Sequence, residues 1–328
     1  MRLGAPVFIE THDPEVFVAE HVRKGYRAAY CPDWINADTD PELCTAFKAS
    51  LAKHDILLAE TGIWRNVLSK NPEDAKAAFE HSVRRLQTAE ELEARCAVNI
   101  VGSWNEEYWD GPHEKHYTQD FFDAAVEAAR TVIDAVKPRH TKMTFEIMPC
   151  QFIDCAAEYI RFIRAVDRSA AGVHLDPANS ISNPRLLYNN AAFFQNEFSL
   201  LGDAVLSIHL KDLRLKPEEF TVQLEEVPIG RGNIDYGNLL RLIDKLPPDT
   251  PAMLEHLASE ALYDEAAASL RGFAGCPVPG APGPAIHQDC RPVTVPCPLH
   301  IADLPPRAAG EERMVQRKNT PAVLWKYV

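Results

Sequence analysis

Short apolar runs alternate with longer amphipathic segments along the first 275 residues of the chain. This alternation is typical of strand–helix units that build a parallel sheet. Apolar runs predict eight buried strands, at residues 6–10, 28–31, 56–60, 97–101, 143–148, 172–176, 206–210 and 252–256. Amphipathic segments predict eight helices, at residues 14–24, 41–53, 72–92, 119–136, 155–166, 186–199, 236–245 and 259–273. Eight units of each kind predict an α/β fold, a closed (β/α)8 TIM barrel.

Local signals support several of these boundaries. The pairs Asp13-Pro14, Asp40-Pro41 and Asn71-Pro72 each supply a capping side chain followed by a proline at the first helical position. The connection at residues 213–233 is predicted to be a long loop over the mouth of the barrel, where substrate contacts are common.

The composition changes abruptly after residue 274. Residues 276–306 carry nine of the 25 prolines of the chain and show no apolar periodicity. We therefore divide the chain into a barrel domain, residues 1–275, and a Pro-rich C-terminal tail, residues 276–328, which is predicted to be extended or disordered. The end of the tail either docks on the barrel or another subunit, or has no function.

Four of the predicted strands place a possible metal ligand at or near their C-terminal ends. These residues are Glu146, Asp176, His209 and Glu255, with spacings of 30, 33 and 46 residues. Each spacing accommodates one strand–helix unit, which takes about 30 residues, so the ligands would lie on successive strands. Because the C-terminal strand ends of a barrel meet at one mouth, we expect the four side chains to converge. Taken alone, each acid would more commonly be a buried ion-pair member, and the histidine a core residue. Here, however, four such structural residues would have to lie at strand ends by coincidence.

This oxygen-rich set with one imidazole favours one divalent metal ion, Mn, Co, Mg or Zn. Two oxygens of a sugar or polyol on the ion would let it stabilise the enediolate that forms when a proton leaves the carbon next to a carbonyl. Moving that proton requires a base on each side of the carbon. We therefore predict that Glu146 and Glu255 are catalytic as well as metal-binding, while Asp176 and His209 only hold the metal.

Polar and aromatic side chains near the predicted mouth suit a sugar, which presents apolar faces and hydroxyl edges. Glu60 ends the third predicted strand and is followed by Trp64 and Arg65, and Asn99 lies in the fourth. Trp64 is predicted to stack on the sugar, although it could instead cover the apolar end of the barrel. Lys211 is predicted to hold a substrate oxygen, with pairing to a neighbouring carboxylate as the alternative.

Two further histidines adjoin the predicted ligands. The two-residue repeat of a strand puts His174 on the face of Asp176, one layer deeper, where it either bonds to the metal ligands or fills the barrel core. The same repeat puts His256 on the face opposite Glu255, packed against the helices, so we exclude it as a ligand.

The net charge of −13 argues against binding to nucleic acid or to an anionic membrane, and favours a small-molecule partner. No apolar stretch is long enough to span a membrane, and no signal-peptide pattern precedes the first acids, so we expect a cytoplasmic protein. The eight cysteines form no paired CxxC motif typical of a structural zinc site. A homodimer through the outer helices is compatible with this pattern.

At these residues the chain resembles the sugar phosphate isomerase/epimerase family of xylose isomerase-like TIM barrels, which includes ketose 3-epimerases, hydroxypyruvate isomerases and inosose dehydratases. The resemblance spans about residues 5–275 and includes the segments His209-Leu210-Lys211-Asp212 and Gly230-Arg231-Gly232-Asn233-Ile234-Asp235-Tyr236. It implies a TIM barrel, a divalent metal and proton transfer next to a carbonyl. Ketose 3-epimerases carry a substrate-binding histidine three residues after the Asp ligand; here that position is Asn179, which becomes a substrate-binding candidate. The family's arginine after the His ligand also lacks a counterpart in the matching place, because Arg214 is displaced.

The sequence therefore predicts a metal-dependent isomerase or epimerase of a sugar or polyol, acting in carbohydrate metabolism. One alternative is an inosose dehydratase-like lyase, because the same enediolate can expel a β-hydroxyl. Another is a non-catalytic sugar-binding barrel, which the fold alone does not exclude. An apurinic endonuclease shares this superfold but would need more metal-binding histidines and a basic groove for DNA.

Overall fold

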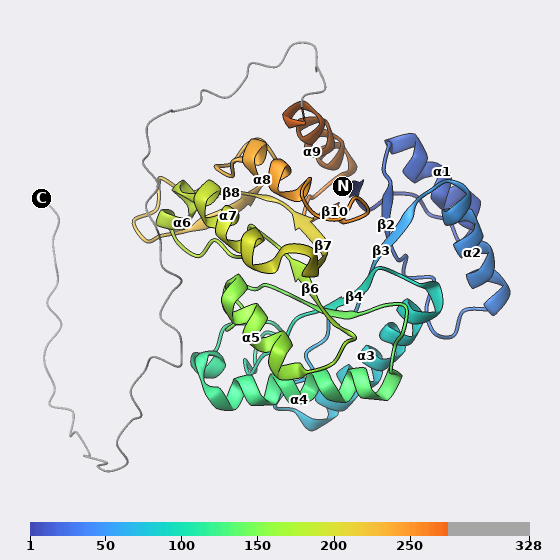
Figure 1. Ribbon diagram of the computed structural model, residues 1–328, viewed down its shortest axis with the longest axis horizontal. Coiled ribbons are helices and arrows are strands. Elements are labelled where there is room, and N and C mark those ends of the chain that lie inside the picture. The colour runs from blue at the N-terminus through green and yellow to red at the C-terminus, as the bar shows by residue number, and fades with distance from the viewer. Residues whose placement is uncertain (275–328) are drawn as a thin grey trace, which may run out of the picture.

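Eight parallel strands close into a barrel in the computed structural model, which describes residues 1–274 (Figure 1). Around the barrel they follow the order β1 (Arg2–Gly4), β10 (Pro251–Leu254), β7 (Val205–Leu210), β6 (Ala171–Leu175), β5 (Met143–Glu146), β4 (Cys96–Asn99), β3 (Leu57–Gly62) and β2 (Ala28–Tyr30). The first and last strands pair in parallel, with Leu3 opposite Ala252, and this pairing closes the barrel. The predicted TIM barrel is therefore confirmed.

The first strand lies elsewhere than predicted. Residues 6–10 form no strand, and β1 runs from Arg2 to Gly4. Pairing across the closure explains this shift, because Arg2 and Gly4 lie in register with Pro251 and Met253. Glycine suits this strand because a Cβ on Gly4 would lie 2.5 Å from the sulfur of Met253. Pro6, in contrast, has no N–H to give to a neighbouring strand.

Helices surround the barrel (Figure 1). They are α1 (Pro14–Lys24), α2 (Pro41–Lys53), α3 (Pro72–Leu92), α4 (Gln119–Val136), α5 (Ala156–Val166), α6 (Pro184–Tyr188), α7 (Asn190–Leu201), α8 (Tyr236–Ile243) and α9 (Glu260–Phe273), with 3-10 turns η1 (Glu114–Tyr117) and η2 (Gly202–Ala204). The predicted caps operate as expected, since Asp13, Asp40 and Asn71 each accept a hydrogen bond from a first-turn N–H. The single helix predicted at 186–199 is instead two helices, α6 and α7, which meet at Asn189.

The connection predicted as an open loop contains an antiparallel hairpin, formed by β8 (Asp212–Leu215) and β9 (Leu224–Val227). The turn after the hairpin is held by the buried carboxylate of Asp212. This carboxylate accepts hydrogen bonds from the N–H groups of Gly230, Gly232 and Ile234, at 3.0, 2.9 and 3.1 Å. The hairpin brings Glu226 of β9 to Lys211, which directly precedes β8.

The main apolar core includes side chains from the strands and from the helices around them. Inside the barrel, Ala28, Ala59 and Met253 form a small separate apolar cluster, whereas Glu60, His174 and Ser207 make a buried polar group. No helix in residues 1–274 is long and apolar enough to cross a membrane. The prediction of an extended or disordered tail concerns residues 276–328, which lie outside the described residues.

Candidate metal centre

The four predicted ligands lie together at the C-terminal end of the barrel. Glu146 ends β5, Asp176 directly follows β6, His209 lies in β7, and Glu255 directly follows β10. One ligand atom of each residue lies within 4.8 Å of those of the other three. Glu255 is the most exposed of the four, with 11% of its side chain accessible. The structure thus brings together all four residues that the strand spacing had selected.

His209 stands at the centre of this group. Its Nδ1 atom lies 2.8 Å from Oε1 of Glu146 and 2.7 Å from Oε2 of Glu255, and its Nε2 atom lies 3.0 Å from Oε2 of Glu60. In a neutral ring that donates Nε2–H to Glu60, Nδ1 keeps a lone pair directed at two carboxylates. Two anions and a lone pair at one point require a positive charge between them, which a proton or a metal ion can supply.

Lys211 supplies a buried positive charge beside the same carboxylates. Its Nζ atom lies 3.0 Å from Oδ2 of Asp176, 2.9 Å from Oε1 of Glu255 and 3.1 Å from Oε1 of Glu226. These Asp176 and Glu255 oxygens are buried and have no hydrogen bond of good geometry, so Lys211 contributes charge without satisfying their lone pairs. The pairing with carboxylates is thus present, while contact of Lys211 with a substrate stays a prediction.

The pKa shifts reflect the concentration of charge. Burial raises the pKa of Asp176 to about 8; Lys211 opposes this rise, and the neighbouring Glu255 and Glu146 add to it. Burial would lower the pKa of His209, but the charges of Glu255 and Glu60 raise it well above its usual value. The ionised form of Asp176 is therefore unfavourable, and the buried Asp176 and Glu255 oxygens next to Lys211 have no hydrogen bond of good geometry. A divalent cation bound between them would compensate for both. The donor set therefore suits the metal predicted from the sequence.

Glu60 is the residue of this site that the sequence analysis misplaced. It lies within β3 rather than at the C-terminal end of the strand, with only 1% of its side chain exposed, and points into the barrel beneath His209. His174 donates to its other oxygen at 3.1 Å, and the hydroxyl of Ser207 donates to that same oxygen. An acid inside the buried run Leu57–Gly62 was the available signal. Three donors thus hold Glu60 against His209, the candidate metal-binding histidine.

The other predicted substrate residues differ in their surroundings. The ring of Trp64 lies 6.2 Å from that of His209, and its positive φ of 47° turns the chain at the mouth. The Asn99 amide is engaged by the backbone of Arg65, from which it accepts and to which it donates at 3.0 Å. The backbone N–H of Asn179 donates to Oδ1 of Asp176 at 3.0 Å. Asn99 and Asn179 thus position neighbouring groups, while their contact with a substrate stays a prediction.

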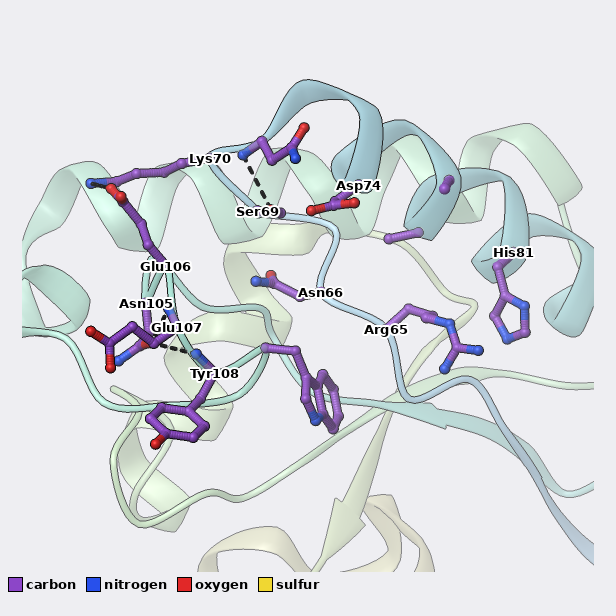
Figure 2. Close-up of a pocket in the computed structure, with 14 residues that line it drawn as sticks. Arg65, Asn66, Ser69, Lys70, Asp74, His81, Asn105, Glu106, Glu107 and Tyr108 are labelled. Atoms are coloured by element: carbon purple, nitrogen blue, oxygen red, sulfur yellow. Dashed lines mark hydrogen bonds and ion pairs between the residues drawn. The ribbon is translucent and has the colours of Figure 1, made fainter.

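Arg65 points into a neighbouring cavity of about 940 Å³, between the loops that follow β3 and β4 (Figure 2). Figure 2 shows His81 on the same side as Arg65, and Lys70 paired with Glu106 on the opposite side at 3.4 Å. None of the four ligands lines this cavity. Arg65 therefore lies beside the metal centre rather than in it.

The prediction that His256 packs against the helices was wrong. Its side chain is 58% exposed, and Nδ1 lies 2.9 Å from Oε2 of Glu226 at the barrel mouth. Strand β10 ends at Leu254, and His256 adopts a positive φ of 57°, so the two-residue repeat no longer applies. His256 and Glu226 therefore form part of the rim around Lys211.

Residues 19–273 match the family model described as xylose isomerase-like TIM barrel. No curated protein matches the chain. Similar solved structures include the D-psicose 3-epimerase of Clostridium cellulolyticum with D-tagatose, at 15% identity and a TM-score of 0.61, covering 84% of this chain and 98% of that one. Endonuclease IV of Thermus thermophilus reaches 16% identity and a TM-score of 0.61, with coverage of 84% and 98%. A xylose isomerase-like TIM barrel protein of Mycobacterium smegmatis in complex with magnesium has 15% identity and a TM-score of 0.55. The match covers 80% of this chain and 87% of that one. At such identities these likenesses show the fold alone, but the family match covers most of the chain: this protein belongs to the xylose isomerase-like TIM barrel family.

Proposed function

We propose that this protein is a divalent-metal-dependent isomerase or epimerase of a sugar or polyol. The observation that carries the proposal is the convergence of Glu146, Asp176, His209 and Glu255 within 4.8 Å at the barrel mouth. The fold cannot carry it, because an epimerase and an endonuclease are similar to this chain to the same degree. The net charge of −13 favours a small neutral substrate over DNA.

The four residues would hold the ion through three carboxylates and Nδ1 of His209. When bound, a divalent ion supplies Lewis-acid stabilisation of the negative charge that develops on the substrate oxygens. Glu60 fixes the His209 ring so that Nδ1 faces the carboxylates. A similar solved structure, the xylose isomerase-like TIM barrel protein of Mycobacterium smegmatis, is a complex with magnesium, which is compatible with such a role.

Glu146 and Glu255 would exchange the proton. They approach His209 from β5 and from the end of β10, which are separated in the barrel by β6 and β7. One carboxylate removes the proton from the carbon next to the carbonyl, and the other returns a proton to that carbon or to its neighbour. The first outcome is epimerisation and the second is isomerisation.

A dehydratase is the second candidate. Asn179 replaces the histidine that ketose 3-epimerases carry at this position, and it engages Asp176 through its backbone. After the same proton abstraction, loss of a β-hydroxyl would give a dehydrated product. An absorbing enone or dione product would identify this reaction.

Metal content is the first test. We expect the purified protein, after gentle desalting, to carry about one equivalent of Mn, Co, Mg or Zn by mass spectrometry. The variant His209→Ala should lose it. The matched control is His140→Ala. His140 is exposed, pairs with Glu90 and precedes β5, whereas the ligand candidate Glu146 lies at the other end of that strand. Absence of metal from the wild type, also after reconstitution, would leave a non-catalytic sugar-binding barrel as the better interpretation.

Proton exchange is the second test. Incubation with ketoses, inososes or hydroxypyruvate in D2O should replace the reacting C–H by C–D, which proton NMR detects. Glu146→Gln should abolish this exchange while an amide oxygen still reaches the metal. Full exchange by Glu146→Gln would contradict the catalytic role of Glu146.

A further inference from the structure

A cavity of about 770 Å³ opens between the loops that follow β1 and β2. Its aromatic lining includes Phe17, Tyr30 and Trp34. Tyr30 joins this cavity to the metal centre, because its ring lies 6.1 Å from that of His209. The Tyr30 hydroxyl donates to the backbone oxygen of Leu254 at 3.3 Å, one residue before Glu255. The cavity and the metal centre thus share one wall.

His21 lines this cavity and carries an acceptor that no described residue uses. It is 1% exposed, and its Nδ1–H donates to the backbone oxygen of Phe17 at 3.0 Å. The tautomer with a proton on Nδ1 leaves a lone pair on Nε2, and this atom has no hydrogen-bond partner among the described residues. Burial lowers the pKa of His21, which favours this neutral form. A buried acceptor without a donor is costly, so the site favours an occupant that brings a hydroxyl or N–H group.

The charges around the cavity limit the chemistry of that occupant. No Lys or Arg of residues 1–274 lines it, whereas the carboxylates of Glu10 and Asp33 do, and neither forms an ion pair with the described residues. Among the described residues, a phosphate or carboxylate group would meet these two acids and no lysine or arginine there, with His12 and His21 as the histidines of the lining. A neutral group rich in hydroxyls can donate to His21 and to both acids, and its apolar face can contact the aromatic wall. A sugar ring combines these properties.

We propose that this cavity is a second sugar subsite, and that the substrate is an uncharged glycoside or oligosaccharide. Its keto sugar lies at the metal centre, and the next ring lies beyond Tyr30, between Trp34 and His21. This inference depends on the proposed function only because it places the first ring, the keto sugar, at the metal centre. The neighbouring cavity near Arg65 is less suited to a neutral ring, because charged side chains of both signs, among them Arg65, Lys70 and Asp74, line it.

Binding of two related ketoses tests the subsite. Isomaltulose is fructose with a glucosyl group on O6, so D-fructose is its matched single-ring probe. Calorimetry on the magnesium-loaded protein should give a dissociation constant for isomaltulose at least tenfold below that for fructose. The variants Trp34→Leu and His21→Phe should each reduce that ratio towards one, with unchanged fructose affinity and magnesium content.

The control is Trp109→Leu, which removes a tryptophan that lines the other cavity and is 45% exposed. It should keep the wild-type ratio. Circular dichroism would show whether Trp34→Leu folds, because Trp34 also packs edge-on against Phe17 and Phe47. If Trp34→Leu does not fold, the comparison with the wild type is made with His21→Phe alone. Equal wild-type affinity for the two sugars, or a ratio unchanged in the folded variants, would overturn the subsite.

A separate measurement distinguishes this inference from the proposed function. Saturation-transfer NMR with methyl α-D-glucopyranoside is applied to His209→Ala, in which the metal centre is disabled. Transfer that disappears when His21→Phe is added supports the subsite even where neither ketose binds at the metal centre. No transfer to this glucoside, together with no preference for isomaltulose, refutes the subsite and leaves the metal centre intact.

Discussion

Replacement of Glu60 by glutamine should weaken divalent-metal binding without unfolding the barrel. Oε2 of Glu60 lies 3.0 Å from Nε2 of His209, and its other oxygen accepts from His174 and Ser207. A glutamine oxygen can still accept from Nε2–H of His209, and its amide can donate to the Ser207 hydroxyl and to Nε2 of His174, whose proton then moves to Nδ1. The variant thus keeps the shape of the side chain and removes its negative charge.

The expected size of the effect follows from these contacts. Loss of the carboxylate that orients a metal-binding histidine costs about 10–100-fold in metal affinity. Glu60→Gln keeps the hydrogen bond and loses its charge assistance, so we expect about tenfold, or ~1.4 kcal/mol. Glu60→Ala loses both and leaves the three donors without an acceptor, so we expect the upper end, about 100-fold.

Calorimetric titration of the metal-free protein with Mg²⁺ or Mn²⁺ measures these affinities. Ser207→Ala is the matched control, because the Ser207 hydroxyl bonds to Glu60 and is not among the candidate ligand groups within residues 1–274. It should change the affinity several-fold less than Glu60→Ala. Nitrogen-15 shifts of His209 would report the tautomer directly. Wild-type affinity in Glu60→Ala would refute the argument that Glu60 orients the metal-binding ring.

Three further changes have defined outcomes. Lys211→Met should lower the melting temperature of the metal-free protein more than that of the metal-loaded protein, because Asp176 and Glu255 lose their buried cation; equal losses would contradict this. Burial raises the pKa of Glu197 from 4.5 to about 7, so in this pH window the folded state holds a proton that the unfolded chain releases. The free energy of unfolding therefore falls as the pH rises through the window, by about 3 kcal/mol in total. Glu197→Gln should remove this fall in thermal unfolding between pH 5 and 8, and an unchanged slope would exclude Glu197 as its source. Trp64→Leu should raise KM severalfold with unchanged metal content if Trp64 stacks on the sugar, and an unchanged KM would favour its alternative role as a cover of the barrel end.

The sequence allowed prediction of features that depend on local chemistry. The helices that begin at Pro14, Pro41 and Pro72 have the bounds expected from their caps and from their amphipathic pattern. The convergence of the four metal-ligand candidates could also be predicted, because each is at or near the C-terminal end of a strand and the barrel fixes where those ends meet. Neither inference required knowledge of contacts between distant segments.

The features that escaped prediction depend on such contacts. Strand β1 is defined by its pairing with β10, about 250 residues away in the chain. The hairpin of β8 and β9 consists of two four-residue strands, too short for their sequence pattern to predict it: β8 alternates polar and apolar residues, whereas β9 has two adjacent acids, Glu225 and Glu226. Glu60 gained its role only when β3 extended to Gly62 and directed the carboxylate beneath His209. Strand pairing and side-chain orientation inside the closed barrel therefore determine these features, and the order of apolar and polar residues does not reveal them.

The balance of buried charge explains why a metal centre fits this barrel better than a passive sugar-binding site. The carboxylates of Glu60, Glu146, Asp176 and Glu255 are almost entirely enclosed, and the positive groups beside them are Lys211 and His209. Burying a carboxylate costs several kcal/mol unless a cation compensates it. With both positive groups charged, an excess of negative charge remains, and Glu255 and Glu146 add to the rise that burial causes in the pKa of Asp176. Amide or hydroxyl side chains would bind a neutral sugar without this cost. The convergence of three carboxylates with Nδ1 of His209 therefore supports our proposal that these four residues hold a divalent cation and that Glu146 and Glu255 transfer a proton.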